Sequence, residues 1–393
     1  MVSAPLVRRE AIPEGALLCV AGEASGDALL GDVLRLLRAR EGSLPFVGVG
    51  GPQARAAGLI SLVDPKELAA HGLSEAAGTV PAFLKALRVL KGALPRCRAL
   101  LLVDFPELNG RLLRAAERMG LPSLWLAPPQ AWAWRPWRAR LVARADWVGC
   151  LFPFSAHWYQ QRGVNARCVG HPLFERAPLP SCSDEGPVAL FPGSRLSVAR
   201  RHLPLLLETA AGIQRADPGR RFTLAASPWL DKDWLARTLR DHSLSLSVTA
   251  DPLEALREAR LTLSVLGTAT LEIALAARPL ITLGTLSPLS AAVARLLLRP
   301  PLSLPNLILG SGEIPELLLS RCTPPLLTAA SIAELRVPAS ARAHAAQQLA
   351  AQLRAAGARW EPALVVAALQ RLLSSPRRIS SPLGGEKDRS ITF

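Results

Sequence analysis

The segment Val20-Ala21-Gly22-Glu23-Ala24-Ser25-Gly26-Asp27 is the most informative stretch of this chain. It follows a short apolar run, residues 16–20, and precedes a helical pattern whose apolar residues recur at Leu30, Val33, Leu34 and Leu37. This order predicts a strand, a tight turn and a helix, as in α/β proteins. Gly22 and Gly26 let a ligand approach the backbone, Ser25 is expected at the helix N-cap, and the helix N-terminus offers N–H groups to an anion or sugar hydroxyl. An ordinary β–α turn is the alternative.

Length and charge restrict the classes of protein. A chain of 393 residues, half of them hydrophobic, is long enough to bury two domain cores. Its formal net charge is +15, and arginine supplies nearly all of it, because lysine occurs only at positions 66, 85, 91, 232 and 387. A charge of this size favours anionic partners, which include phosphorylated substrates, acidic lipid surfaces and nucleic acid.

The sequence also indicates the cellular compartment of the protein. No stretch reaches the roughly 18 consecutive apolar residues that span a bilayer, and the N-terminus lacks a signal-peptide layout. We therefore expect a cytoplasmic protein. The six cysteines form no CxxC pair and are expected to be small buried side chains rather than metal ligands or disulfides.

Apolar strand-like runs alternate with longer helical patterns through most of the chain, which predicts parallel sheets with helices on both faces. The expected strands are residues 16–20, 46–49, 100–103, 121–126 and 147–152 in the first half, and 188–191, 222–226, 244–248, 261–265 and 280–283 in the second. The sequence thus predicts two Rossmann-like domains that face each other across a cleft, with ligands at the carboxyl ends of the strands.

A Pro- and Ser-rich stretch separates the two halves. The expected organisation is an N-terminal domain over residues 1–176, a linker over 177–187, a C-terminal domain over 188–373 and a disordered tail over 374–393. Helices are expected at residues 340–356 and 362–373, where they are able to pack back on the first domain.

Asp104 directly follows the expected strand 100–103, where an α/β architecture places functional groups. A carboxylate at the mouth of a buried strand can accept a proton from a sugar hydroxyl, as a general base does. The alternative is that Asp104 caps the next helix.

Two glycine turns in the second half have the composition of a phosphate site. Pro192-Gly193-Ser194-Arg195 follows one expected strand and combines backbone amides, a hydroxyl and a guanidinium, which suits a diphosphate. Gly267 and Thr268 follow another strand at a helix start, and Glu272, about one turn further, can hydrogen-bond both hydroxyls of a ribose. The alternatives are a surface turn with a solvated arginine, and helix capping by Thr268 and Glu272.

Aromatic and basic residues are concentrated in Trp132-Ala133-Trp134-Arg135-Pro136-Trp137-Arg138-Ala139-Arg140. Amphipathic rings beside arginine suit a membrane headgroup layer or an amphiphilic substrate, and such interleaving also serves single-stranded nucleic acid. Core tryptophans with arginine side chains reaching outward are an equally good interpretation. His171 stands near the expected domain junction and is either structural or a ligand contact.

Taken in order, nine motifs resemble those of the lipid-A-disaccharide synthase family of GT-B glycosyltransferases, and the resemblance extends from about residue 17 to residue 373. Any one of the motifs is unspecific alone, whereas nine in the correct order are hard to obtain by chance. The motifs are residues 21–27, 48–52, 67–68 with 72, 132–135, 153–154, 170–173, 192–195, 267–272 and 303–307.

The resemblance implies an inverting transfer of the sugar of UDP-2,3-diacylglucosamine to the 6-hydroxyl of 2,3-diacylglucosamine 1-phosphate, which gives a β-1,6 disaccharide and UDP. It implies that Asp104 is the base. The implied donor-binding residues are Gly193, Ser194, Arg195, Gly267 and Thr268 at the diphosphate, Glu272 at the ribose and Asn306 at the edge of the nucleotide pocket. The implied acceptor-side residues are Gly22, Glu23, Ser25, Gly26, Asp27, Trp132, Trp134 and Arg135.

The same resemblance implies no cofactor and no metal, because helix dipoles and arginine can stabilise the departing diphosphate. It implies no nucleic-acid partner, and a peripheral position on the cytoplasmic face of the inner membrane, reached through residues 132–140 and the amphipathic segment 286–299. A homodimer is compatible with the sequence, which determines neither the oligomeric state nor the acyl-chain length.

Four places depart from the family pattern. Asp104-Phe105-Pro106-Glu107-Leu108-Asn109 stands for Asp-Ala-Pro-Asp-Phe-Asn, and residues 126–130 read Leu-Ala-Pro-Pro-Gln instead of Tyr-Val-Ser-Pro-Ser. Leu266 replaces a serine and His71 replaces a methionine. These changes affect acceptor detail more than reaction type.

Two other functions stay open at this point. Another GT-B enzyme acting on a UDP-sugar, such as an epimerase, would share the nucleotide half but lack the motifs at 22–27 and 132–135. A non-catalytic basic protein that binds nucleic acid or membrane would not need Asp104, Arg195 and Glu272.

Overall fold

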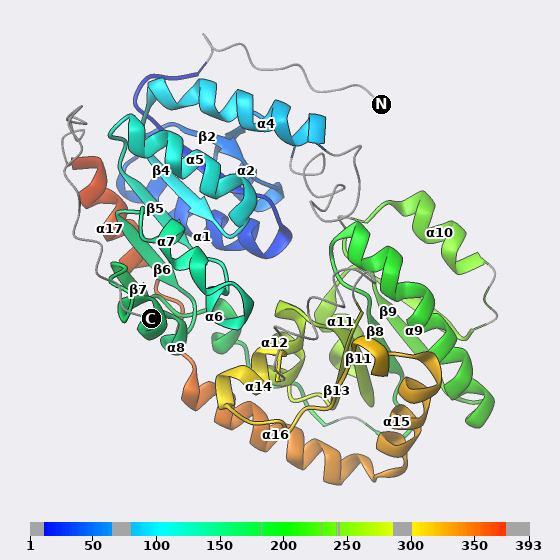
Figure 1. Cartoon of the computed structure of the whole chain (residues 1–393). Helices are drawn as coiled ribbons and strands as arrows, with labels where there is room; N and C mark the ends of the chain where they lie inside the picture. Colours follow the sequence, from blue (N-terminus) through cyan, green and yellow to red (C-terminus); the bar gives the residue numbers. More distant parts are fainter. Residues whose placement is uncertain are drawn as a thin grey trace. The chain divides into compact units, whose positions relative to one another are not determined.

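The computed structural model describes residues 12–64, 80–181, 183–228, 230–240, 242, 244–285 and 301–374. The chain divides into two compact units, Met1–His171 with Arg359–Phe393, and Pro172–Ala358. Each unit contains one parallel sheet covered by helices (Figure 1), so the prediction of two Rossmann-like α/β domains is confirmed. Several expectations lie outside the described residues: the motif at 67–72 with His71, the segment 286–299, and the tail from 375 onward.

The first unit is built on a seven-stranded sheet in the order β3-β2-β1-β4-β5-β6-β7. Its strands are β1 (Ala16–Ala21), β2 (Phe46–Val49), β3 (Leu59–Ser61), β4 (Cys97–Val103), β5 (Ser123–Leu126), β6 (Trp147–Cys150) and β7 (Ala166–Cys168). Along β1, Leu17 and Cys19 enter one core while Leu18 and Val20 enter the other. Both faces are therefore buried, which explains why the central strands are continuous apolar runs.

Two layers of helices cover this sheet. One face packs against α1 (Ala24–Arg40), α2 (Pro52–Ala56) and α17 (Pro362–Ser374). The other face packs against α4 (Val80–Ala93), α5 (Pro106–Arg118), α6 (Ala131–Trp134), α7 (Ala139–Val142) and α8 (Pro153–Gln160). The short turns η3 (Leu94–Arg96) and η4 (Pro136–Arg138) join these helices to their neighbours. The last helix of the described residues, α17, thus completes the core of the first unit.

The second unit is built on a six-stranded sheet in the order β10-β9-β8-β11-β12-β13. Its strands are β8 (Val188–Phe191), β9 (Phe222–Ala225), β10 (Leu246–Thr249), β11 (Leu261–Val265), β12 (Leu280–Gly284) and β13 (Glu316–Leu318). Its helices are η5 (Pro172–Glu175), α9 (Leu196–Ala216), α10 (Lys232–Arg240), α11 (Pro252–Arg257), α12 (Thr268–Leu275), α14 (Leu304–Leu309), η6 (Leu319–Arg321), α15 (Pro324–Arg336) and α16 (Ala339–Ala356).

Both sheets reverse their strand order once, between β1 and β4 and between β8 and β11. In open parallel sheets a crevice forms at such a reversal, because the connections on its two sides leave in opposite directions. The turns that follow these four strands contain Gly22, Asp104, Gly193 and Gly267. The topology therefore places the strongest motifs of the sequence at the two positions where this architecture binds ligands.

Strands predicted at 46–49, 188–191 and 261–265 agree with the structure to the residue. The sequence did not predict β3, β7 and β13, which are three residues long and lie at sheet edges. Such short segments show no periodic pattern. Four of the five described cysteines are buried. None of the helices in the described part of the chain has the length and apolar character that a membrane crossing needs.

Candidate functional site

The turn after β1 starts helix α1 differently from the expectation. Glu23 occupies the N-cap position in an extended conformation, and no side chain caps the helix. The prediction that Ser25 is the N-cap is wrong, because Ser25 lies exposed within the first turn of the helix. Gly22 has a structural reason to be glycine, since a Cβ there would lie 2.8 Å from the Phe105 ring.

Asp27 holds the main chain of another loop. Its carboxylate accepts hydrogen bonds from the backbone N–H groups of Gly51 at 2.7 Å, Gln53 at 3.0 Å and Ala54 at 3.1 Å. The side chain is buried and caps the N-terminus of α2, where orphan N–H groups need acceptors. Asp27 thus holds the loop that begins α2, and its expected role on the acceptor side stays a prediction.

Asp104 lies at the end of β4 in an unusual backbone conformation. Asp104 and Phe105 have φ angles of 47° and 44°, in the left-handed region. Two consecutive non-glycine residues there are rare, and such strain is concentrated at functional sites. The N-cap of α5 is Phe105 rather than Asp104. The alternative that Asp104 is the N-cap is therefore wrong, and its half-buried side chain stands at the strand-order reversal.

The Trp132 segment follows β5, next to β4 in the sheet. Its Trp132 ring packs edge-on against Phe154 at 4.9 Å, Phe154 stacks on Phe152 at 5.7 Å, and Phe152 stacks on His171 at 6.1 Å. His171 is buried in this aromatic cluster. The interpretation of core tryptophans therefore holds in part, whereas Trp137 on η4 is 60% exposed. The side chain of Trp134 lies outside the described residues.

Arginine side chains connect this segment to α5. Arg138 donates a hydrogen bond to Glu107 at 2.8 Å, so the departure at position 107 keeps a carboxylate with a defined partner. Burial lowers the pKa of Arg135, and the neighbouring charge of Arg138 lowers it further, while Glu107 opposes both. Gly22 and Trp132, which are expected on the acceptor side, and Asp104, the expected base, thus lie after three adjacent strands, β1, β4 and β5.

In the second unit, the glycine turn after β8 leads directly into α9. Gly193 has φ = 98°, and a Cβ there would lie 2.8 Å from Val198, so conformation and space both require glycine. Ser194 is exposed, and the exposed Arg195 occupies the N-cap position of the 21-residue helix. A helix N-terminus with an adjacent guanidinium is suited to bind an anion.

The turn after β11 repeats this arrangement on the neighbouring strand. Gly267, with φ = 156°, is the N-cap of α12, and Thr268 is its first residue. No side chain caps this helix, which excludes Thr268 as its N-cap. The N-termini of α9 and α12 therefore lie at the carboxyl ends of two adjacent strands.

Glu272 on α12 pairs with Arg176, which directly follows η5. Burial raises the pKa of the Glu272 carboxyl, the charge of Arg176 lowers it, and Asp251 adds a smaller increase. Arg354 on α16 fixes this arrangement, because it donates hydrogen bonds to the carbonyl oxygens of Arg176 at 2.8 Å and Leu275 at 2.6 Å. The sequence pointed to Glu272 but not to Arg176, its ion-pair partner, nor to Arg354, which holds the main chain on both sides of the pair.

Asn306 has a structural role in the segment that contains α14. Its amide nitrogen donates to the Ile314 carbonyl and to Glu316, both at 2.9 Å, and its oxygen accepts from the Ile314 N–H at 3.0 Å. Glu316 also accepts from the hydroxyl of Ser303 at 2.7 Å. Asn306 is buried and holds the loop between α14 and β13, and its expected place at the edge of the nucleotide pocket stays a prediction.

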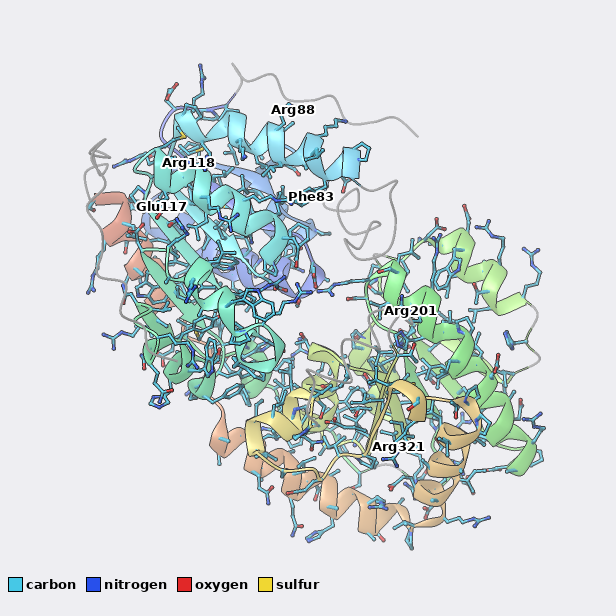
Figure 2. The ribbon with its side chains drawn as sticks, viewed as in Figure 1. Phe83, Arg88, Glu117, Arg118, Arg201 and Arg321 are labelled. Carbon is cyan, nitrogen blue, oxygen red and sulfur yellow. The ribbon has the colours of Figure 1, made fainter. Side chains whose placement is uncertain are left out.

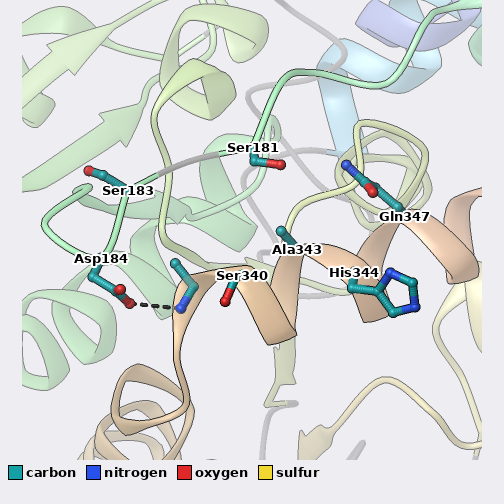
Figure 3. A pocket seen from close by; sticks show the side chains of 8 residues that line it. Ser181, Ser183, Asp184, Ser340, Ala343, His344 and Gln347 are labelled. Atoms are coloured by element: carbon teal, nitrogen blue, oxygen red, sulfur yellow. Dashed lines mark hydrogen bonds between the residues drawn. The ribbon is translucent and has the colours of Figure 1, made fainter.

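The second unit also contains a pocket between residues 181–184 and α16 (Figure 3). There Asp184 accepts a hydrogen bond from the Ala339 N–H at 2.7 Å at the start of the helix. Arg260 also contacts Asp184, at 3.4 Å. None of the expected site residues lines this pocket. Within the described ranges, His, Cys, Asp and Glu side chains form no cluster suited to a metal ion.

Comparisons with known proteins show the family and the fold of this chain. A family model described as lipid-A-disaccharide synthetase matches residues 17–364. The lipid-A-disaccharide synthase of Anaeromyxobacter dehalogenans (strain 2CP-C) is 37% identical over 333 residues, which cover 80% of this chain and 86% of that protein.

Solved structures share the fold at low sequence identity. The calicheamicin glycosyltransferase CalG4 is similar with a TM-score of 0.53 and 16% identity, over 94% of this chain and 100% of that chain. MurG of Acinetobacter baumannii has a TM-score of 0.50 and 14% identity, over 91% of this chain and 99% of that chain. From its sequence match and its two Rossmann-like units, the chain belongs to the lipid-A-disaccharide synthase family and is a glycosyltransferase of GT-B architecture.

Proposed function

We propose that this enzyme transfers the sugar of UDP-2,3-diacylglucosamine to 2,3-diacylglucosamine 1-phosphate, with inversion, to form the β-1,6-linked disaccharide 1-phosphate and UDP. The family match supports the choice of substrates. The observation that supports it most is the position of Asp104 and of the Arg195 turn, each at the strand-order reversal of its own sheet.

On the acceptor side, the proposal makes Asp104 the general base. Its carboxylate takes the proton of the 6-hydroxyl as that oxygen bonds to the anomeric carbon of the donor sugar. The bond from the anomeric carbon to the diphosphate oxygen breaks on the opposite face, and its electron pair leaves with UDP. A single displacement of this kind inverts the configuration.

On the donor side, the departing diphosphate gains negative charge in the transition state. Arg195 and the N-termini of α9 and α12 supply cationic charge and N–H donors from a preformed scaffold, which is the arrangement that stabilises a developing anion. Glu272, further along α12, accepts hydrogen bonds from the two ribose hydroxyls.

The test is an assay of the purified protein with both lipid substrates in mixed micelles, with UDP and disaccharide measured separately. We expect equal amounts of UDP and β-1,6 disaccharide, and neither product when one substrate is omitted. UDP release without the monosaccharide phosphate, or conversion of another UDP-sugar only, would favour a different GT-B activity. Tight binding of DNA without turnover would overturn the proposal.

We further infer that the protein contacts an anionic membrane through one surface of its first unit. Exposed cations on α4 and α5, two helices that pack together, form this basic face. The residues of the basic face are Lys85, Arg88 and Lys91 on α4, and Arg111, Arg114 and Arg118 on α5. Figure 2 shows Arg88 and Arg118 on these helices. Leu84, 45% exposed, adds an apolar side chain to α4.

Two acidic residues of α5 connect this helix to residues 138–144 through ion pairs. Glu117 on α5 pairs with Arg144, and Glu107 at the start of the same helix pairs with Arg138 beside the exposed Trp137. The ion pairs of the described residues include none of the six cations of the basic face, which leaves these charges to attract acidic headgroups.

Reversing two charges of the basic face tests whether it binds an anionic membrane. We expect the double variant Arg88→Glu, Arg118→Glu to bind phosphatidylglycerol vesicles on the order of tenfold more weakly or worse, since each basic residue near the surface contributes to the attraction. The double variant Arg321→Glu, Arg336→Glu reverses two exposed arginines of the second unit, of which Figure 2 labels Arg321; it is the matched control and should retain binding. Equal binding of the unmodified protein to neutral and acidic vesicles would contradict the electrostatic contact.

The ion pair of Glu272 predicts a pH effect on nucleotide binding. Since Arg176 lowers the pKa that burial raises, Arg176→Gln should raise the pKa of Glu272 further. The carboxylate then becomes protonated at a higher pH, so UDP affinity should fall at a higher pH than in the unmodified protein as the pH is lowered. Calorimetric titration with UDP over a pH series measures this shift. Arg336→Gln, an exposed arginine on α15, should leave the profile unchanged, and an unshifted profile for Arg176→Gln would separate Glu272 from nucleotide binding.

A further inference from the structure

The main chain at Asp104 is held by two buried side chains. The indole Nε1 of Trp125, on the neighbouring strand β5, donates a hydrogen bond to the Asp104 carbonyl oxygen at 3.2 Å. The Nδ2 of Asn109, one turn into α5, donates to the same oxygen at 2.6 Å and to the Val103 carbonyl at 3.1 Å. Both side chains are fully buried. One carbonyl at the end of β4 thus receives two donors from two different elements.

These contacts act on the strained part of the backbone. Fixing the carbonyl of Asp104 fixes the peptide plane between Asp104 and Phe105, and with it the ψ angle of the first residue and the φ angle of the second. Both residues are in the left-handed region, which an unrestrained aspartate or phenylalanine seldom adopts. The N–H of Asp104 is bonded in turn to the Leu126 carbonyl at 3.0 Å. The direction in which the Asp104 side chain leaves the backbone therefore depends on this carbonyl.

Two further observations concern the surroundings of the left-handed conformation at Asp104 and Phe105. The Oδ1 of Asn109 is buried and has no hydrogen-bond partner among the described residues, although buried polar atoms are normally paired. The Phe105 ring lies so close to Gly22 that any Cβ there would collide with it. Unpaired polar atoms and strain persist where the surrounding structure over-determines a conformation, as at active sites.

We propose that Trp125 and Asn109 are positioning residues, which hold the Asp104 main chain in its left-handed conformation and thereby direct the carboxylate at the acceptor hydroxyl. This inference rests on the proposed role of Asp104 as the base. Neither side chain needs to touch a substrate, and a small displacement of a reacting group is enough to slow a reaction severely. Trp125 thus has a function besides core packing.

The experiment compares Trp125→Phe with Trp360→Phe. Both changes shorten a buried tryptophan of the first unit, but the indole nitrogen of Trp360 has no partner among the described residues. We expect Trp125→Phe to lower kcat on the order of tenfold to a hundredfold, with KM for both substrates and calorimetric UDP affinity unchanged. Trp360→Phe should leave kcat unchanged. Equal kcat values for the two variants, or a loss confined to KM, would overturn the proposal.

A double-variant cycle separates positioning from general structural damage. In the Asp104→Asn background, adding Trp125→Phe should not lower the residual single-turnover rate further, because no base is left to direct. An equal further loss would show that Trp125 acts independently of Asp104 and would overturn the inference. Full turnover of Asp104→Asn itself would instead refute the base. If Trp125→Phe does not fold, Asn109→Ala enters the same cycle with the same expected outcomes.

Discussion

Replacement of Asp104 by asparagine is expected to lower the rate of disaccharide formation by about 10²- to 10⁴-fold while leaving UDP binding intact. The amide has nearly the same shape as the carboxylate but cannot take the proton of the 6-hydroxyl, and loss of a general base typically costs about 10²- to 10⁴-fold in rate. UDP affinity should persist because the turns proposed to bind the diphosphate, which contain Gly193 and Gly267, belong to the second unit, whereas Asp104 belongs to the first. Turnover measured by UDP release, beside calorimetric UDP titration, tests both statements.

The matched control for this variant is Asp32→Asn. Asp32 is a partly exposed carboxylate on α1 that pairs with Arg35 three residues later, and such surface pairs contribute little to stability or function. Its variant should retain the unmodified rate. If Asp104→Asn turned over at the rate of the control, the base would have to be sought among other groups after β1 and β5.

Replacement of Arg195 by alanine is the second change with a large expected effect. The guanidinium adjoins the N-terminus of α9 directly after the Gly193 turn, where the proposal places the departing diphosphate. Loss of a preorganised group that stabilises transition-state charge typically costs about 10²- to 10³-fold, so kcat/KM should fall by this amount. UDP should also bind more weakly, because part of the same charge is present in the product.

Arg200→Ala provides the comparison on the same helix. Arg200 is exposed, and its guanidinium lies 6.0 Å from the centre of the Trp234 ring, a distance at which a cation–π contact contributes little. Its variant should keep both UDP affinity and turnover. Arg195→Lys should recover only part of the activity, since lysine retains the charge but not the planar pair of donors. Equal kinetics for the Arg195 and Arg200 variants would place the diphosphate elsewhere.

Local periodicity explains how much of the fold the sequence could predict. Strands such as 16–21 and 188–191 were recognisable because both of their faces are buried, which favours uninterrupted apolar residues. The three-residue edge strands lack such a signal, since their positions are set by pairing with a longer neighbour. The order of strands in each sheet is likewise absent from any single segment, because it depends on which strands pair.

The residues of the candidate site could likewise be predicted from the sequence only in part. Gly22 and Gly193 could be singled out from sequence, and each has a physical reason in the structure, a close aromatic ring or a positive φ. Asp27 and Asn306 have the right chemistry for ligands, yet their polar atoms are used by backbone groups of other segments. Whether a carboxylate or amide faces a ligand depends on such distant partners, which sequence spacing does not reveal.

The fold class, the family and the positions of the glycine turns could be predicted from the sequence, because these depend on local pattern and on the order of motifs. Only the tertiary structure decided that the turns containing Gly22 and Asp104 flank one strand-order reversal, and that those containing Gly193 and Gly267 flank another. It also decided that Trp125 and Asn109 meet at one carbonyl. The physical reason is that strand pairing and side-chain burial bring together residues whose separation along the chain has no fixed period.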